Sequence, residues 1–332
     1  MTTKQQKAFG LFLLFAAAVV WGFAFPMQSA AAEHVGSFTL NCCRSLLGGA
    51  FLVLCILVLD KKKERRLFSR KAPHIDVTKR EWIGGILCGV VLCFAINFQQ
   101  LGIAGEATDS GKAAFITALY VVLVPLFNLF AGKRPRPAVW LCIVFALLGF
   151  YLLSAPIVVE EAGLLGFLRA LGKSGFRFAT SDILVFICAV IFSVHVIVID
   201  LFAEGTDGVR ISCIQFFTAG ILSLPLMIFL DKPALSDIMA AALPILYLAI
   251  LSSGIGYTAQ IVGQKYVDVA IAPMVLSLES VFGAIGGALL LQETKTAVQI
   301  VGCVIVFGAV ILVQLPARKK KEKKGESQEN RE

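Results

Sequence analysis

The chain lacks three sequence features typical of enzymes. It has no G-x-x-x-x-G-K-[ST] motif, which argues against ATP hydrolysis, and no H-E-x-x-H motif of a zinc protease. Its apolar segments hold no Ser/His/acid set typical of an intramembrane hydrolase. The nine cysteines all lie in apolar segments and form no C-x-x-C pair, so they indicate neither disulfides nor a metal site. We therefore expect no catalytic residue, no metal ion and no cofactor.

Long polar stretches are also lacking, so little of the 332-residue chain remains for a soluble domain. Hydrophobic residues make up 58% of the chain and come in blocks of about twenty, the helical length that crosses the apolar core of a bilayer. We predict an all-α integral membrane protein with ten transmembrane helices. They are expected at residues 8–30, 36–59, 82–104, 110–131, 137–155, 182–203, 209–230, 239–263, 269–291 and 297–316.

The net charge of +8 is unevenly distributed along the chain. With a cytoplasmic N-terminus, 23 of the 30 Lys and Arg residues fall in cytoplasmic segments, six are external and Arg44 lies within a span. This asymmetry follows the positive-inside rule, so the Lys61–Arg66 run indicates topology and we expect no nucleic-acid partner. We predict a multi-pass protein of the cytoplasmic (inner) cell membrane with both termini inside, Lys61–Arg80 inside and Ile157–Asp182 outside.

The chain contains a weak internal repeat. An offset of 171 pairs residues 15–59 with residues 186–230, and a later offset of 159 pairs residues 109–149 with 268–308. The matched pairs include Trp21 with Phe192, Glu33 with Glu204, Cys42 with Cys213, Arg44 with Gln215, Gly49 with Gly220, Asp60 with Asp231, Asp109 with Asp268, and Tyr120 with Glu279. Each repeat has five crossings, and because five is odd the second repeat enters the membrane from the opposite side. We therefore predict two inverted five-helix repeats.

This repeat sets the expected organisation of the chain. We place the first five-helix repeat at residues 8–155, an external connecting loop at 156–181 and the second repeat at 182–316. Residues 317–332 form a basic tail that we expect to be cytoplasmic and disordered. The connecting loop contains Leu164–Phe178, for which a surface-lying helix and a plain linker remain open. The first span has a counterpart in the repeat, so we keep it as a membrane helix and not as a cleaved signal peptide.

Three segments carry a resemblance to a known family. They are AAAVVWGFAFP in the first span, NCCRSLLGGAFLVL in the second, and LESVFGAIGGALLLQETKTAVQIVGCVIVFGAVIL from Leu278 to Leu312. With these segments the chain resembles the EamA-type transporters of the drug/metabolite transporter superfamily over residues 8–316. The resemblance implies ten helices in two inverted halves, a central cavity lined mainly by the first four helices of each half, and alternating access. It implies no particular substrate, since similar members handle amino acids, metabolites or toxic compounds.

Charge within a membrane span is costly and usually faces a bundle interior or water, and three ionisable residues stand out there, namely Arg44, His195 and Glu279. Arg44 and Glu279 are each about ten residues into their spans, which predicts positions near the midplane. We interpret Arg44 as an anchor for a carboxylate or other anion. We interpret Glu279 as the proton-coupling residue, because low dielectric disfavours its charged form. The alternatives are a structural ion pair between the two, an Arg44 that snorkels outward, and for His195 a simple packing role.

Neutral polar residues recur three or four positions apart in the spans expected to line the cavity, so each set shares one helix face. Examples are Asn97 with Gln100, and Tyr257 with Gln260. We predict a substrate cavity lined by Trp21, Asn41, Arg44, Asn97, Gln100, Tyr120, His195, Gln215, Tyr257 and Gln260. Hydrogen bonds between helices would explain the polar members equally well, and simple packing would explain Trp21.

The sequence thus predicts a secondary active transporter, a permease or exporter. It would move a small organic solute, such as an amino acid, a metabolite or a drug-like compound, by alternating access. The expected partners are that solute, membrane lipid and protons as coupling ion, and whether the protein is a monomer or a homodimer stays open. The alternative is a membrane-embedded enzyme or a non-transporting scaffold. A transporter brings its polar residues to one cavity shared by both halves, whereas an enzyme places a catalytic pair near one interface.

Overall fold

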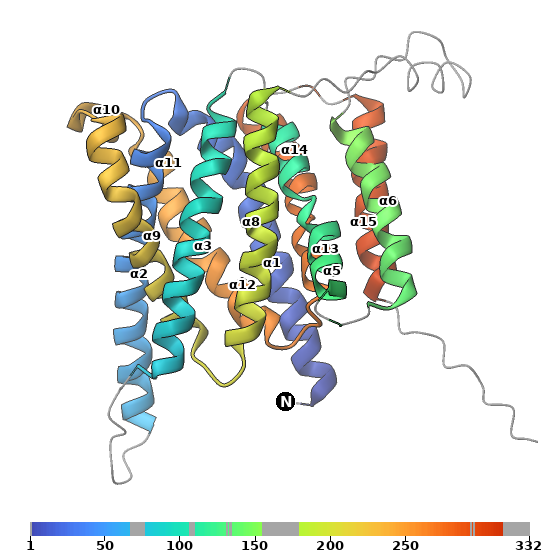
Figure 1. The fold of residues 1–332 in the computed structure, drawn as a ribbon, viewed down its shortest axis with the longest axis horizontal. Coiled ribbons are helices and arrows are strands. Elements are labelled where there is room, and N and C mark those ends of the chain that lie inside the picture. Colours follow the sequence, from blue (N-terminus) through green and yellow to red (C-terminus); the bar gives the residue numbers. More distant parts are fainter. Residues whose placement is uncertain are drawn as a thin grey trace, which may run out of the picture.

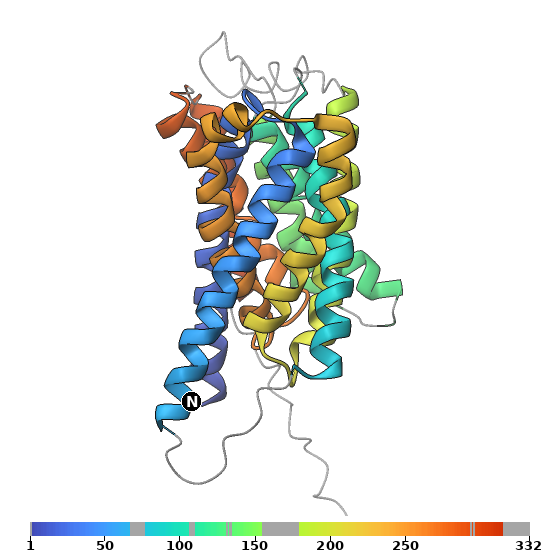
Figure 2. The same ribbon diagram turned by 90° about the vertical axis from the view of Figure 1, so that its left-hand side faces the viewer.

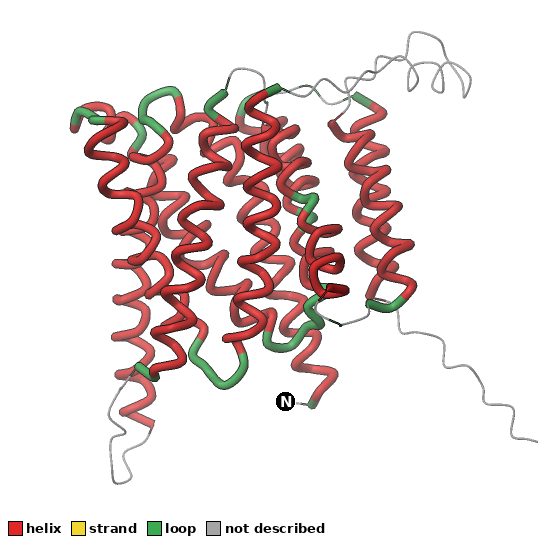
Figure 3. The backbone as a smooth tube through the Cα atoms, viewed as in Figure 1, coloured by secondary structure: helices red, strands yellow, loops and turns green. Residues whose placement is uncertain are grey.

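The computed structural model describes residues 2–66, 77–105, 110–130, 132, 135–154, 179–292, 294 and 296–314. Within these ranges the protein is a bundle of helices without a β-strand (Figure 3). The first half contains α1 (Thr3–Ala32), α2 (Ser37–Arg66), α3 (Lys79–Ile103), α4 (Ser110–Thr117) with α5 (Tyr120–Phe130), and α6 (Pro137–Ser154). The second half contains α8 (Thr180–Ala203), α9 (Gly208–Leu226) with η1 (Met227–Asp231), α10 (Leu235–Ala240), α11 (Ala242–Leu246) with η2 (Tyr247–Tyr257) and α12 (Thr258–Gln264), α13 (Ala272–Leu276) with α14 (Glu279–Leu290), and α15 (Ala297–Gln314).

These elements form ten crossings of a bilayer-sized bundle, which confirms the predicted fold class. Eight crossings are long and apolar enough to span a membrane, and α6 and α15 contain shorter apolar stretches at Pro137–Leu152 and Ala297–Val313. The chain enters α1 and leaves α15 at the same end of the bundle (Figure 1). We call this end the N-terminal end, and we call the end at which α1 stops and α2 begins the opposite end.

The helix boundaries differ from the predicted ones mainly after the second span. α2 continues through the basic run to Arg66, because Lys, Arg and Glu are good helix formers and no Gly or Pro interrupts them. The helix therefore extends beyond the predicted span, which ends at residue 59. The joining segment at 155–178, including Leu164–Phe178, and the tail at 315–332 lie outside the described residues.

The two halves pack against each other in equivalent pairs. α1 packs on α14, and its counterpart α8 packs on α4 and α5; α3 packs on α8, as η2 and α12 pack on α1. The pairs α2 with α9 and α6 with α15 join equivalent helices of the two halves, and Figure 2 shows α2 and α9 side by side. An inverted repeat has this pattern, because a two-fold axis in the membrane plane exchanges the halves.

Side-chain contacts between α2 and α9 obey the same symmetry. The Cys42 thiol donates to the Gly220 carbonyl at 3.6 Å, and the Cys213 thiol donates to the Gly49 carbonyl at 3.7 Å. The offset of 171 read from the sequence exchanges these two contacts. The repeat found in the sequence is thus a structural two-fold, and these cysteines are small packing residues at its centre.

Two crossings are interrupted near their middles, which the sequence did not predict. α4 and α5 are separated at Ala118 and Leu119, where the Val121 amide bonds the Ala118 carbonyl at 3.0 Å. α13 and α14 are separated at the equivalent place, where the Ser280 amide bonds the Ser277 carbonyl at 3.1 Å. These three-residue bonds replace the four-residue bonds of an α-helix.

The close crossing of α1 and α14 depends on Gly22. A Cβ atom added there would lie 2.3 Å from the Phe282 Cβ atom and 2.8 Å from the Gly283 amide nitrogen. Because backbone atoms block the site, we expect Gly22→Ala to destabilise the fold by about 1–3 kcal/mol. Thermal unfolding in detergent measures this loss. The control is Gly308→Ala, where no atom lies within 4 Å and better helix propensity predicts an unchanged or raised melting temperature. Equal melting temperatures for the two variants would contradict this account.

Candidate functional site: a charged cavity between the two halves

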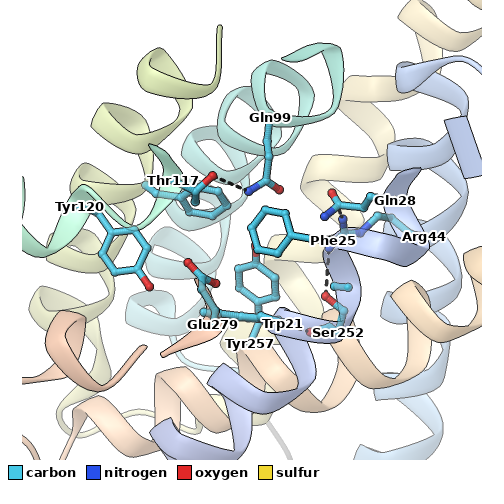
Figure 4. A pocket seen from close by; sticks show the side chains of 12 residues that line it. Trp21, Phe25, Gln28, Arg44, Gln99, Thr117, Tyr120, Ser252, Tyr257 and Glu279 are labelled. Atoms are coloured by element: carbon cyan, nitrogen blue, oxygen red, sulfur yellow. Dashed lines mark hydrogen bonds between the residues drawn. The ribbon is translucent and has the colours of Figure 1, made fainter. Parts of the chain in front are cut away.

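A small cavity lies inside the bundle and is lined by both halves (Figure 4). Its walls come from α1, α2, α3, the α4–α5 break, α8, η2 and the start of α14. The lining residues are Trp21, Ala24, Phe25, Gln28, Arg44, Gln99, Thr117, Tyr120, Phe192, Ser252, Tyr257 and Glu279. The cavity volume is about 30 Å³, which holds about two water molecules and no organic solute.

One side of the cavity is formed by Arg44. Its side chain is buried, with 2% of its surface exposed, so it does not snorkel outward. The guanidinium donates to the Gln28 Oε1 atom at 3.4 Å, the Ser252 hydroxyl at 3.3 Å and the Ser253 hydroxyl at 3.3 Å. All three acceptors are neutral and distant for charge-assisted bonds. Arg44 forms no ion pair with any described residue, so its charge is buried without a counter-charge.

A wide helical segment shapes the wall next to Arg44. η2 is a π-helix, a rare form often found at functional sites, and it carries Ser252, Ser253 and Tyr257. The Trp21 indole donates to the Ser252 carbonyl at 3.3 Å, and the centroids of the Trp21 and Tyr257 rings lie 4.6 Å apart. The π-helix and α1 thereby fix an aromatic surface beside the guanidinium.

The other side of the cavity is formed at the two helix interruptions. Glu279 is the first residue of α14 and Tyr120 the first residue of α5, so the two breaks place repeat-equivalent side chains in one cavity. The Tyr120 hydroxyl and the Glu279 Oε1 atom are buried and make no hydrogen bond of standard geometry within the described residues. Next to them the Gln99 amide donates to the Thr117 hydroxyl at 3.2 Å. The Glu279 carboxyl group and the Tyr120 hydroxyl thus lie at the same wall of the cavity.

Arg44 and Glu279 face the same cavity but do not pair with each other. In Figure 4 the rings of Phe25 and Tyr257 lie between them. The structural ion pair considered from the sequence is therefore absent from this conformation. The cavity has a cationic end, an aromatic middle and an acidic end.

Two predicted cavity residues instead connect helices. The Asn41 amide donates to the Ile96 carbonyl at 3.0 Å and to the Asn97 Oδ1 atom at 3.1 Å. The Asn97 amide donates to the Cys93 carbonyl at 2.8 Å and to the Ser223 hydroxyl at 3.1 Å. This network joins α2, α3 and α9 and does not line the cavity in this conformation.

The four other predicted residues outside the lining are also buried. The Gln100 side-chain amide donates to the backbone carbonyl of Gln28, the residue whose side chain accepts from Arg44, at 3.2 Å. His195 and Gln215 bond each other at 3.2 Å, while the Gln260 Oε1 atom makes no hydrogen bond within the described chain. Trp21, Arg44, Tyr120, Tyr257 and Glu279 are the predicted residues that the structure brings together at the cavity.

Several lining residues were missed in the sequence. Phe192 is the repeat partner of Trp21, so the offset of 171 was a signal for it. Trp21, Phe25 and Gln28 follow one face of α1 at helical spacing, which was a signal for Gln28. Ser252 carried no such signal, because a π-helix changes which residues share a face. Within the described residues, no group of three or more His, Cys, Asp or Glu side chains is placed to hold a metal ion.

The comparisons with known proteins agree with this architecture. Residues 8–155 and 179–315 match the model of the EamA-like transporter family. An uncharacterized transporter of Archaeoglobus fulgidus is 27% identical over 303 residues, covering 90% of this chain and 83% of the relative. An uncharacterized transporter of Clostridium kluyveri is 24% identical over 267 residues, covering 79% of each chain.

A protein of known crystal structure has the same fold. Its TM-score is 0.68 at 19% identity, and the match covers 92% of this chain and 98% of that protein. The family, the transporter relatives and the ten apolar crossings identify a multi-pass membrane transporter. The chain belongs to the EamA-like transporter family of the drug/metabolite transporter superfamily.

Proposed function

We propose that the protein is a secondary transporter that moves a small organic solute with an anionic group by alternating access. The observation that carries this proposal is the buried Arg44 side chain, which has only neutral partners in a cavity shared by both halves. A buried cation without a counter-charge is costly, and a bound anion removes that cost. The aromatic rings of Trp21, Phe25 and Tyr257 favour an organic solute, because they provide apolar area beside the charge.

Glu279 is the coupling residue in this proposal. It supplies a buried carboxyl group beside Tyr120, on the opposite wall from Arg44, at a helix interruption that can bend. A carboxyl group that faces each solution in turn loads a proton on one side and releases it on the other. The proton is thus exchanged in the same cavity that takes the solute.

A matched series of solutes tests the anionic requirement. The series contains an organic carboxylic acid, its neutral amide and the corresponding amine, with the same carbon skeleton in each. We expect the acid to raise the melting temperature of the purified protein and to be taken up by proteoliposomes, because only the acid supplies the missing counter-charge. The amide and the amine are the controls for size and apolar area. Equal binding of all three across several skeletons would contradict the proposal.

The proposed orientation places the N-terminal end in the cytoplasm, following the distribution of basic residues. Glu33 and Glu204 are repeat-equivalent, exposed and located in turns at opposite ends of the bundle. We expect an impermeant thiol reagent added to intact cells to label Glu33→Cys and not Glu204→Cys, in a background without native cysteines. Inside-out vesicles should give the reverse result. Labelling of Glu204→Cys alone in intact cells would invert the topology.

A further inference from the structure

The contact between α2 and α9 is closed at the opposite end of the bundle by Asp231. Its Oδ2 atom accepts hydrogen bonds from the Thr39 amide at 2.7 Å and from the Thr39 hydroxyl at 2.8 Å. Asp231 ends η1, the continuation of α9, and its carboxylate therefore caps the first turn of α2 from another helix. Gly36 makes room for this carboxylate, because a Cβ atom there would lie 2.3 Å from the Asp231 Cγ atom. We call this contact the Asp231 latch.

A second contact closes the N-terminal end of the same interface. The Arg210 guanidinium lies 3.5 Å from the Asp60 carboxylate, and each side chain has 14% of its surface exposed. Here the first turn of α9 is capped by its own Asp207, which accepts from the Val209 amide at 2.9 Å. Asp60 therefore contacts the Arg210 side chain, whereas Asp231 binds a backbone amide in the first turn of a helix. We call this contact the Asp60 latch.

The repeat exchanges the two latches. The offset of 171 takes Thr39 to Arg210 and Asp60 to Asp231, so each latch joins the end of one helix to the first turns of its partner. The centre of the interface lies between them. There a Cβ atom on Gly220 would lie 2.6 Å from Leu46, and one on Gly49 would lie 3.1 Å from Phe217, again an equivalent pair. The interface is thus tightly packed at its centre and held by a carboxylate at each end.

We propose that the Asp231 and Asp60 latches open alternately and so control which end of the bundle admits solution to the cavity. The inference rests on the proposed alternating access. Both latches are formed in this structure, which accords with a cavity too small for a solute. Opening one end separates α2 from α9 there and breaks that latch, while the packed centre acts as the pivot and the other latch holds. Equivalent contacts at the two ends are what an inverted repeat requires of such a device.

The test measures from which side a cavity residue is reached and needs no transported solute. A single cysteine replaces Ala24, a small lining residue, in a background without native cysteines. An impermeant maleimide is added to intact cells or to inside-out vesicles, and the ratio of the two labelling rates is determined. We expect Asp231→Asn to change this ratio at least threefold toward the opposite end and Asp60→Asn to change it at least threefold toward the N-terminal end. Thr39→Val and Arg210→Gln should shift the ratio in the same direction as their respective partners.

The control is Asp237→Asn, at the same end as Asp231. Asp237 accepts from the Ala234 amide at 3.2 Å and caps only α10, so its loss should leave the ratio unchanged. General loosening of the fold speeds labelling from both sides and does not produce opposite shifts. The proposal is overturned if the two latch variants shift the ratio in the same direction or not at all, or if the control shifts it equally. If Asp231→Asn does not fold, Thr39→Val provides the same comparison. Since labelling is independent of uptake, failure here leaves the anionic-solute proposal intact, and the reverse also holds.

Discussion

Arg44→Gln is expected to weaken binding of the anionic solute by roughly tenfold to hundredfold while the protein stays folded. Hydrogen bonds to a charged group contribute about 1.5–3 kcal/mol, and about 1.4 kcal/mol corresponds to a factor of ten. Stability should hold or rise, because the variant removes a buried charge that has no counter-charge in the empty protein. Glutamine also occupies the equivalent position 215 in the second half, so the backbone accommodates it. Solute-dependent melting temperatures and proteoliposome uptake measure the two effects separately.

Arg44→Lys is the matched control for charge. It keeps the cation but loses the planar fork that binds a carboxylate with two parallel hydrogen bonds, so we expect an intermediate affinity. A different pattern would indicate an ion pair formed in another conformation. In that case Arg44→Gln would fold poorly, and adding Glu279→Gln would restore the yield, because neutralising both members of a buried pair removes the stranded charge. Such a rescue would contradict the anion-anchor role.

Glu279→Gln is expected to abolish accumulation of solute driven by a pH gradient and to preserve counterflow exchange. Exchange needs the cavity but not the proton, whereas uphill movement needs a group that takes up and releases one. A proton crossing 100 mV supplies about 2.3 kcal/mol, enough for about fifty-fold accumulation of a neutral species. The amide has the size of the carboxyl group and holds no exchangeable charge. Uptake into proteoliposomes with and without an imposed gradient distinguishes the two activities.

Tyr120→Phe is the control for Glu279→Gln. Tyr120 occupies the equivalent position in the first half and lines the same cavity, but a phenol keeps its proton near neutral pH. The control should alter solute affinity and retain coupling. Gradient-driven accumulation by Glu279→Gln at the wild-type level would make Glu279 a structural residue.

The fold could be predicted because its signals are long and repeated. The prediction rests on ten apolar blocks, on the odd number of blocks in each repeat, and on the excess of basic residues on one side of the membrane. Each of these signals is summed over many residues, so a few mismatched residues do not alter the predicted fold. The helix interruptions at Ala118–Leu119 and Ser277–Leu278 carry no comparable signal. Neither contains glycine or proline, and each depends on a few backbone bonds that span three residues and not four. Local geometry of this kind is set by packing between the halves, which a sequence does not display.

Among the residues of the candidate site, the charged ones could be predicted more readily than the neutral polar ones. Arg44 and Glu279 stood out because buried charges need a reason, and both line the cavity. Asn41 and Asn97 had the same helical spacing as cavity residues but bond each other across helices. A side-chain amide can form its hydrogen bonds equally well with a neighbouring helix or with a solute. The residue type alone therefore does not distinguish a helix-packing role from a cavity-lining role.

In the proposed alternating access, the symmetry of the α2–α9 interface has a consequence for the free energies of the two open states. Because the two latches lie at equivalent positions of the repeat, we expect the free energies of the two open states to differ little. The remaining free-energy difference comes from equivalent positions that hold different residues, such as Thr39 and Arg210. At roughly 1 kcal/mol per hydrogen bond, one such position alters the population ratio about fivefold. Under this proposal, substitutions at the two ends of the α2–α9 interface change the side to which the empty protein opens, without any change to the candidate solute cavity.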